Sequence, residues 1–141
     1  MGMETIEQKQ KEIIEEFALF EDWMGKYEFI IDLSKDLESM DDSLKDEDHL
    51  VRGCQSQVWL EAKTEDGLIH FQADSDALIT KGLIAMLVRV LSGQKANDIA
   101  TSDLFFIDEI GLHEHLSPNR SNGLASMVKK MKTYAIAYSA S

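Results

Sequence analysis

The sequence lacks the features that mark secreted and membrane-spanning proteins. Its 141 residues include one cysteine and one proline. A single cysteine cannot form an internal disulfide, so a reducing cytoplasm is the expected compartment. No apolar run approaches the roughly 18 residues that span a bilayer. The acidic N-terminus also lacks the apolar region of a secretory signal.

The chain also has little positive charge. Its formal net charge is -12, and the first 50 residues hold 16 acidic and 5 basic side chains. Phosphate binding needs a positive surface, so nucleic acid is not expected as a partner. The acidic half could steer a basic protein partner toward the chain, although an ordinary solvated acidic surface explains the same charge.

What is present fits one domain over residues 1–141, with Met1 to Met3 as a remnant of expression cloning. The length suits a single core. Hydrophobic residues make up 44% of the chain and charged residues 28%, which is typical of globular proteins. No internal repeat or linker divides the sequence.

Helical periodicity accounts for most of the apolar residues. In the third of the long helices, Gly82 predicts close packing and Leu78 belongs to the apolar face, while Gly93 ends the helix. The polar stretch 40–48 is too acidic and irregular to pack, and residues 116–118 form a loop. The spacing predicts helices over residues 4–22, 27–38, about 76–91, 96–100, 103–110 and 121–138.

Between these helices the period changes to two, which predicts strands over residues 58–63 and 68–73. Asp66-Gly67, within the turn Thr64 to Gly67, favours a hairpin. A short extended segment from His49 to Arg52 would add a third strand. The predicted fold is therefore α+β, with a small antiparallel sheet of about three strands packed against N- and C-terminal helices.

The lone cysteine, Cys54, is the residue whose setting indicates chemistry. Arg52 and Gly53 precede it, and polar residues including Gln55 and Ser56 follow it. A single intracellular cysteine is most often a small buried hydrophobe. Cys54 does not fall on an apolar stripe, however, and a nearby arginine could stabilise the reactive thiolate. These features favour a working thiol at the tip of a loop.

Other chemistries find little support. Hydrolytic cysteine catalysis needs a histidine base, but none of the four histidines has a recognisable spacing to Cys54. A metal site needs a cluster of thiolates or imidazoles, and no glycine-rich phosphate loop is present. We therefore expect no metal and no cofactor, and the thiol itself becomes the candidate nucleophile.

Three motifs resemble the SufE family, which includes the CsdE-like proteins. They occur in order and together span much of the chain. The matching runs are GCQSQVWL at residues 53–60, ADSDALITKGLIAML at residues 73–87, and LSPNRSNGL at residues 116–124.

The resemblance implies a function and partners. SufE-like proteins accept persulfide sulfur from a pyridoxal-phosphate cysteine desulfurase of the SufS type, stimulate that enzyme, and pass sulfur toward a SufBCD-like scaffold for iron–sulfur cluster assembly. Cys54 falls on the acceptor position. The implied role is that of a sulfur-transfer accessory protein rather than an independent enzyme, acting as a monomer or weak homodimer. The family fold is related to the IscU scaffold, but this chain lacks the further cysteines that would hold a cluster.

Several other residues are candidates for support. Arg120, in the third motif, could stabilise the thiolate, contact the desulfurase, or only tie the last helix to the body. Asp74 could cap a helix or lock the Cys54 loop, and Asp76 could also serve as a cap. Trp59 could line a shelter for the thiol or pack elsewhere. Gln55 and Ser56 could hold the loop by hydrogen bonds, in a sheltered state when the protein is free and an extended state when it is docked. The alternative function is a non-catalytic adaptor of the assembly machinery with an incidental thiol.

Overall fold

The computed structural model describes residues 4–53 and 56–139. Its helices precede and follow a β-hairpin as the sequence predicts, although several bounds differ. The elements are α1 (Ile6–Phe17), α2 (Trp23–Leu33), η1 (Ser34–Asp36), η2 (Asp42–Leu44), β1 (Val58–Glu65), β2 (Leu68–Ser75), α3 (Leu78–Leu91), β3 (Gln94–Lys95), α4 (Ala96–Ala100), α5 (Phe106–Glu109), α6 (Leu112–His115) and α7 (Pro118–Ser139).

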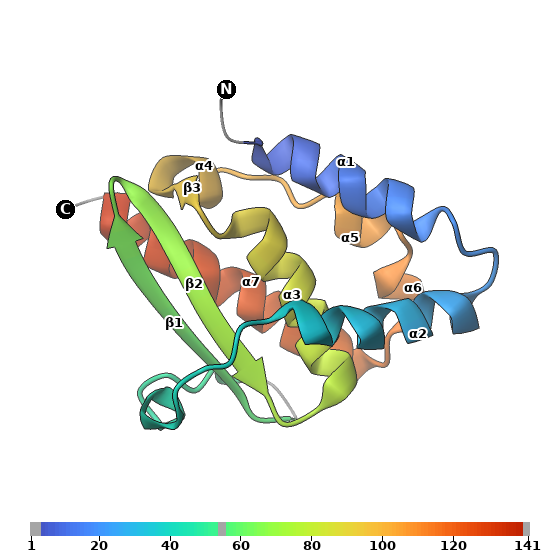
Figure 1. Ribbon diagram of the computed structural model, residues 1–141, viewed down its shortest axis with the longest axis horizontal. Helices are drawn as coiled ribbons and strands as arrows, with labels where there is room; N and C mark the ends of the chain where they lie inside the picture. The colour runs from blue at the N-terminus through green and yellow to red at the C-terminus, as the bar shows by residue number, and fades with distance from the viewer. Residues whose placement is uncertain (1–3, 54–55, 140–141) are drawn as a thin grey trace.

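The α+β prediction is confirmed by a three-stranded antiparallel sheet in the order β1-β2-β3 (Figure 1). The turn between β1 and β2 is tighter than predicted, because only Asp66 and Gly67 lie outside the strands. Both have positive φ angles, 54° and 79°. Such a turn matches the twist of the flanking strands, and glycine adopts it without steric cost.

The third strand is not the one predicted. The segment His49 to Arg52 contributes a single bridge, in which Leu50 lies opposite Trp59 on the edge of β1. Backbone hydrogen bonds of 2.8 Å flank this bridge on both sides. The third strand is instead β3, which pairs with the start of β2. Gly93 turns the chain into it with a φ of 80° and donates its N–H to the carbonyl of Ile69.

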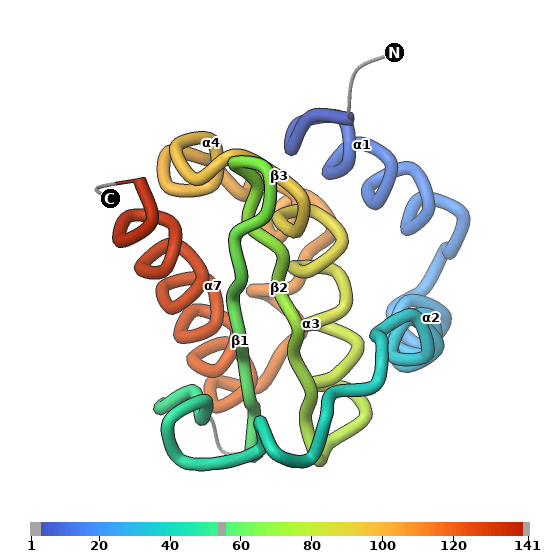
Figure 2. Tube along the Cα trace, turned by 60° about the vertical axis from the view of Figure 1, so that its left-hand side comes forward, coloured from blue at the N-terminus to red at the C-terminus, as the bar shows by residue number. Residues whose placement is uncertain are grey.

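Helix α3 is the centre of the core, because it contacts the sheet, α1, α2 and α7. In Figure 2 α7 appears on the left of the two long strands and α3 on their right, with α1 and α2 beyond α3. The close packing predicted at Gly82 is confirmed, since a β-carbon there would overlap the backbone carbonyl of Ile30 on α2. Most of the α3 residues are therefore buried.

The first two helices both end earlier than predicted, and the second also begins earlier. A capping box between Thr5 and Gln8 starts α1, which ends at Phe17 rather than residue 22. Asp22 then caps α2 by accepting the N–H of Gly25 at 2.8 Å, so α2 begins at Trp23. Gly25, which the sequence suggests as a break between helices, lies within the first turn of α2.

Later boundaries also shift. The first residue of α3 is Leu78, and its N-cap, Ala77, makes no side-chain capping bond, so the expected cap from residues 74–76 is wrong. Helix α7 begins at Pro118 rather than Ser121, and Ser117 accepts the N–H of Arg120 at 3.3 Å. Proline suits this first helical position because its missing N–H would have no helical partner there. The predicted helix over residues 103–110 is confined to α5, and α6 follows it.

The stretch over residues 40–48 is not the unpacked loop that its composition indicates. Met40 is buried, and residues 42–44 form the short helix η2. Lys45 then reaches the outer face of the sheet, where it forms an ion pair with Asp74. This segment therefore fastens the chain to the sheet shortly before the predicted functional loop.

Candidate functional site

Cys54 and Gln55 lie outside the described residues, so the site is built from their described neighbours. Gly53 precedes them and Ser56 follows them. Both neighbours can be placed relative to α3 and α7, and together they show which part of the molecule the candidate site borders.

Gly53 lies against α7. Its φ angle is +90°, and a β-carbon at this position would lie 2.5 Å from the Oγ of Ser126. Only glycine meets both demands without strain. Ser126 gave no signal in the sequence, because it lies on a predicted helix outside the motif LSPNRSNGL.

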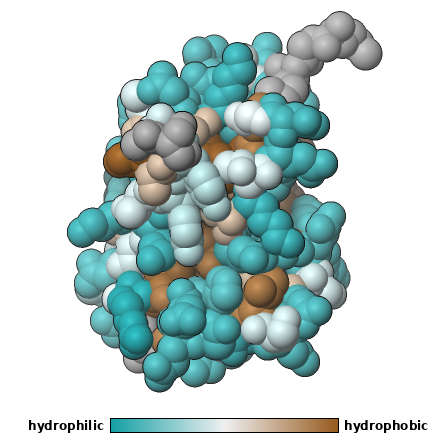
Figure 3. Space-filling view, turned by 90° about the vertical axis from the view of Figure 1, so that its left-hand side faces the viewer, coloured by the Kyte–Doolittle hydropathy of each residue, from teal (hydrophilic) through white to brown (hydrophobic). Residues whose placement is uncertain are grey.

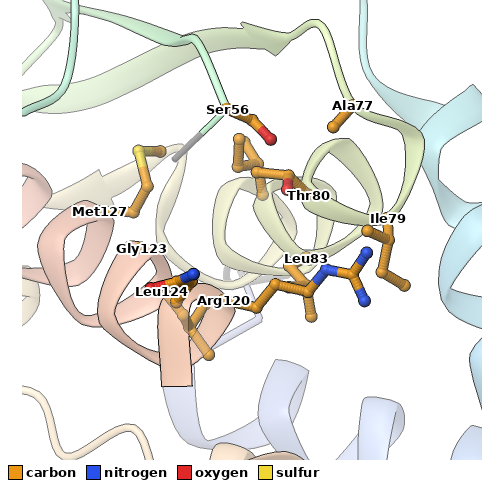
Figure 4. Close-up of a pocket in the computed structure, with 11 residues that line it drawn as sticks. Ser56, Ala77, Ile79, Thr80, Leu83, Arg120, Gly123, Leu124 and Met127 are labelled. Atoms are coloured by element: carbon orange, nitrogen blue, oxygen red, sulfur yellow. The ribbon is translucent and has the colours of Figure 1, made fainter. Parts of the chain in front are cut away.

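Ser56, on the other side, lines a cavity of about 100 Å³ between α3 and α7. Figure 4 shows the side chains that converge there from the two helices, most of them apolar. The first turns of both helices contribute to the lining, so the positive ends of two helix dipoles lie nearby and favour an anion such as a thiolate. The cavity is lined by Ser56, Ala77, Ile79, Thr80, Leu83, Ile84, Asn119, Arg120, Gly123, Leu124 and Met127.

Asp76 holds the chain just after Ser56. Its Oδ1 accepts the backbone N–H of Gln57 at 3.0 Å, and its own N–H donates to the Gln57 carbonyl at 3.2 Å. The sequence suggests Asp76 only as a helix cap. In the structure it joins the start of α3 to the loop. The paired residues, Asp76 and Gln57, are 19 positions apart in the sequence.

Arg120, which the sequence also suggests as a site residue, lies at the cavity. It is exposed, lines the cavity from the first turn of α7, and forms no ion pair within residues 4–53 and 56–139. In Figure 4 its guanidinium lies beside Ile79 of α3, away from Ser56. Arg52 is likewise exposed and has no ion pair with the described residues.

Asp74 does not line the cavity but organises the outer face of the sheet. Its carboxylate pairs with Lys45 at 3.1 Å and Lys81 at 3.2 Å, and it accepts the Ser75 N–H at 2.8 Å. Burial alone raises the pKa of this carboxyl, but the hydrogen bonds from Lys45, Ser75 and Lys81 outweigh burial and hold the pKa below its ordinary value. Asp74 thus fixes the chain segment that leads into the loop.

Trp59 belongs to this outer face and does not shelter the cavity. It lies opposite Asp74 in the β1–β2 register, and the Lys45 ammonium lies 5.8 Å from its ring centroid.

Figure 3 shows the side of the molecule on the left of Figure 1. Its surface is mostly hydrophilic, with apolar atoms in small separate areas.

Three of the four histidines have partners outside the cavity. His49 bonds to Asp46 at 2.7 Å, and this bond lowers the pKa of that carboxyl. His115 stacks on Trp23, and His113 lies 3.2 Å from Asp108. Across residues 4–53 and 56–139, no three histidine, aspartate or glutamate side chains gather closely enough to hold a metal ion. None of the helices in the same part of the chain is both long and apolar enough to cross a membrane.

The comparisons with known proteins agree with the resemblance seen in the motifs. Residues 11–135 match the family model described as "SufE: Fe-S metabolism associated domain". The chain therefore belongs to the SufE family.

Individual relatives cover most of the chain. It is 40% identical over 129 residues to a SufE-like protein of Rhizobium meliloti, covering 88% of this chain and 92% of the relative. It is 37% identical over 138 residues to a SufE-like protein of Synechocystis, covering 98% of this chain and 87% of the relative. The chain is also 37% identical to the Arabidopsis thaliana "SufE-like protein 1, chloroplastic/mitochondrial". This match covers 95% of this chain but only 36% of the relative.

The fold itself also has a solved counterpart. A solution structure of a hypothetical protein from Thermus thermophilus superimposes with a TM-score of 0.77, covering 94% of this chain and 97% of the other. At 18% identity this likeness concerns the fold alone.

Proposed function

We propose that Cys54 accepts sulfur from the persulfide of a SufS-type cysteine desulfurase, stimulates that enzyme and relays the sulfur to a SufBCD-like scaffold in the cytoplasm. The observation that supports this most directly is the position of the two described neighbours of the Cys54–Gln55 pair. Gly53 contacts α7, and Ser56 lines the cavity between α3 and α7. Membership of a family associated with Fe–S metabolism is consistent with this role.

The transfer step needs no oxidant or reductant. The Cys54 thiolate attacks the terminal sulfur of the donor persulfide, a new S–S bond forms at Cys54, and the donor's own S–S bond breaks. The electron pair of the broken bond stays on the donor cysteine, which leaves as a thiolate. Such an exchange is faster when the attacking thiol is ionised and accessible.

The described residues suit these requirements. The first turns of α3 and α7 line the cavity, so the positive ends of these helices would favour a thiolate there, while the apolar cavity walls would exclude water from a bound persulfide. In this proposal Arg120 contacts the thiolate or the partner. Asp76 holds the loop through its hydrogen bonds with Gln57.

The test is sulfur loading followed by intact mass measurement. The protein is incubated with a SufS-type desulfurase and cysteine, and we expect the mass of one sulfur atom to be added and then removed by dithiothreitol. Because the chain has a single cysteine, such an adduct identifies Cys54. The Cys54→Ser variant should gain no sulfur and lose stimulation of the desulfurase. An unmodified wild-type mass would contradict the proposal, and full stimulation by Cys54→Ser would support the adaptor function instead.

A further inference from the structure

Two large apolar side chains are exposed together where the chain passes from α1 to α2. Leu19 is 80% exposed and Met24 is 72% exposed. Phe20 packs against Gly25, because a β-carbon at Gly25 would lie 3.1 Å from the Cδ1 atom of the Phe20 ring. This contact draws the two ends of the connection together. Leu19 and Met24 therefore lie at one corner of the molecule, where Figure 1 shows the chain turning from α1 into α2.

The backbone of this corner is held by contacts of its own. The Phe20 ring stacks on Phe29 of α2 with ring centroids 5.0 Å apart, and Phe29 meets the buried Phe17 edge to face at 5.1 Å. Asp22 caps α2 by accepting the N–H of Gly25. The fold thus places aromatic rings at the corner while the two exposed side chains add little to its stability. A surface that is fixed in advance costs little ordering entropy when a partner binds.

The charge around the exposed pair is almost entirely negative. Residues 15–28 hold five acidic side chains and one basic side chain. Glu16 is bound to Arg89, and Asp22 serves as the cap. The three carboxylates that remain exposed without an ion pair among the described residues are those of Glu15, Glu21 and Glu28. One exposed leucine would mean little, but an exposed apolar pair accompanied by unpaired charges of one sign has the composition of a contact surface.

We propose that this corner, made of Leu19, Met24 and the carboxylates of Glu15, Glu21 and Glu28, is a docking surface for a basic amphipathic helix of another protein. The two apolar side chains would be buried against the apolar face of that helix, and the carboxylates would contact lysine or arginine side chains beside it. Methionine suits such a contact because its unbranched side chain adapts to different shapes. An anionic membrane does not fit, because its negative surface repels unpaired carboxylates.

The corner is separate from the candidate sulfur-acceptor site. The cavity beside Ser56 is lined by residues of α3 and α7 and of the segments that precede β1 and α3, and none of the lining residues belongs to α1, to α2 or to the connection between them. The docking surface therefore goes beyond the proposed function, because it does not depend on whether Cys54 accepts sulfur.

The binding experiment uses a model helix as the probe. A fluorescein-labelled peptide of about 18 residues, with leucine on one face and lysine on the other, is titrated with the protein, and fluorescence anisotropy gives the dissociation constant. For the double variant Leu19→Gln, Met24→Gln we expect this constant to rise about tenfold. The pair Glu21→Gln, Glu28→Gln should raise it about fivefold at low salt and less at high salt. A peptide with glutamate in place of lysine should not bind.

The controls separate loss of the surface from loss of the fold. Ile136→Gln changes a 58%-exposed apolar side chain on α7, and its dissociation constant should stay within about twofold of wild type. Glutamine is close in size to leucine and methionine and favours helices, so the leucine–methionine double variant should unfold at the wild-type temperature. Its rate of sulfur loading by a SufS-type desulfurase should also match wild type.

Four results would overturn the assignment. The corner is not the docking surface if the lysine peptide fails to bind wild type or binds the leucine–methionine double variant equally well. Equal binding of the glutamate peptide would contradict the role of the carboxylates. If wild type is a dimer in analytical ultracentrifugation and the double variant a monomer, the corner binds a second copy of this chain instead. A folded double variant that loses sulfur loading would assign the corner to sulfur transfer. Failure of wild type to gain sulfur, in contrast, would contradict only the proposed function.

Discussion

The two ends of the α3–α7 helix pair differ in how their polar side chains are bonded. Toward the C-terminal ends, Arg89 binds Glu16, Lys132 donates to the carbonyl of Ser102 at 2.7 Å, and Tyr138 donates to the carbonyl of Ala62 at 3.0 Å. At the end where both helices begin, Arg120 is exposed without an ion pair among the described residues, beside a cavity and the exposed Leu78.

This difference separates side chains that stabilise the fold from side chains that remain exposed. Contacts at the C-terminal end join helices to strands and loops, so they contribute to the stability of the fold. At the other end Arg120 and Leu78 are exposed, so we expect these two side chains to contribute little to stability. Substitutions at the two ends should therefore change different measurements.

The largest expected contrast concerns two glycines. Gly82→Ala should lower the free energy of unfolding by about 3 kcal/mol or more, because the new β-carbon overlaps the Ile30 carbonyl between two packed helices. Gly53→Ala should cost only about 1–2 kcal/mol for its positive φ but slow sulfur loading severalfold by moving the chain off Ser126. Urea unfolding and loading rates measure the two effects. If both variants are fully folded and lose the same share of their sulfur-loading rate, the predicted difference between the two glycines is wrong.

The two arginines give the next contrast. Arg89→Ala should lower the free energy of unfolding by about 1–2 kcal/mol, because it leaves Glu16 without its charged hydrogen bonds. Arg120→Ala should change it by less than about 0.5 kcal/mol, yet reduce the rate of sulfur loading. Thermal unfolding and intact mass measured on the same samples test both statements, and a destabilised Arg120→Ala would show that this arginine is structural.

The smallest effect is a pH dependence at Asp74. Its folded-state pKa is lowered, so its stabilising contribution is complete above the unfolded-state pKa of about 3.9 and is lost as the pH falls through the folded-state value. Asp74→Asn should cost about 1 kcal/mol at neutral pH. It should also flatten the loss of stability below about pH 4. Urea unfolding of both proteins from pH 7 to pH 3 checks this, and parallel curves would contradict it.

The sequence predicts those parts of the fold whose cause is local. Asp66-Gly67 indicates the hairpin because a two-residue turn with positive φ angles suits these residues. Gly82 indicates close packing because glycine in a helix is costly without such a reason. The α+β class follows from the change of period between helices and strands, and the family from three motifs.

The remaining features depend on contacts between distant residues. Strand β3 has two residues, too few to show alternation, and exists because Gly93 brings the chain back to Ile69. The pairing of Asp76 with Gln57 and the contact of Gly53 with Ser126 likewise join separate parts of the chain. Leu78 follows the helical pattern of a buried residue, but its side chain is exposed. The role of Cys54 itself stays a prediction, since it lies outside the described residues.

The hydroxyl of Tyr138 has a consequence for the behaviour of the protein in concentrated solution. Strand β1 lies at an edge of the sheet, where backbone groups can pair with a strand of another molecule and begin an aggregate. Leu50 covers one position of this edge, and Tyr138 occupies the Ala62 carbonyl further along. The last turns of α7 therefore help to keep the hairpin from becoming a template for β-aggregation.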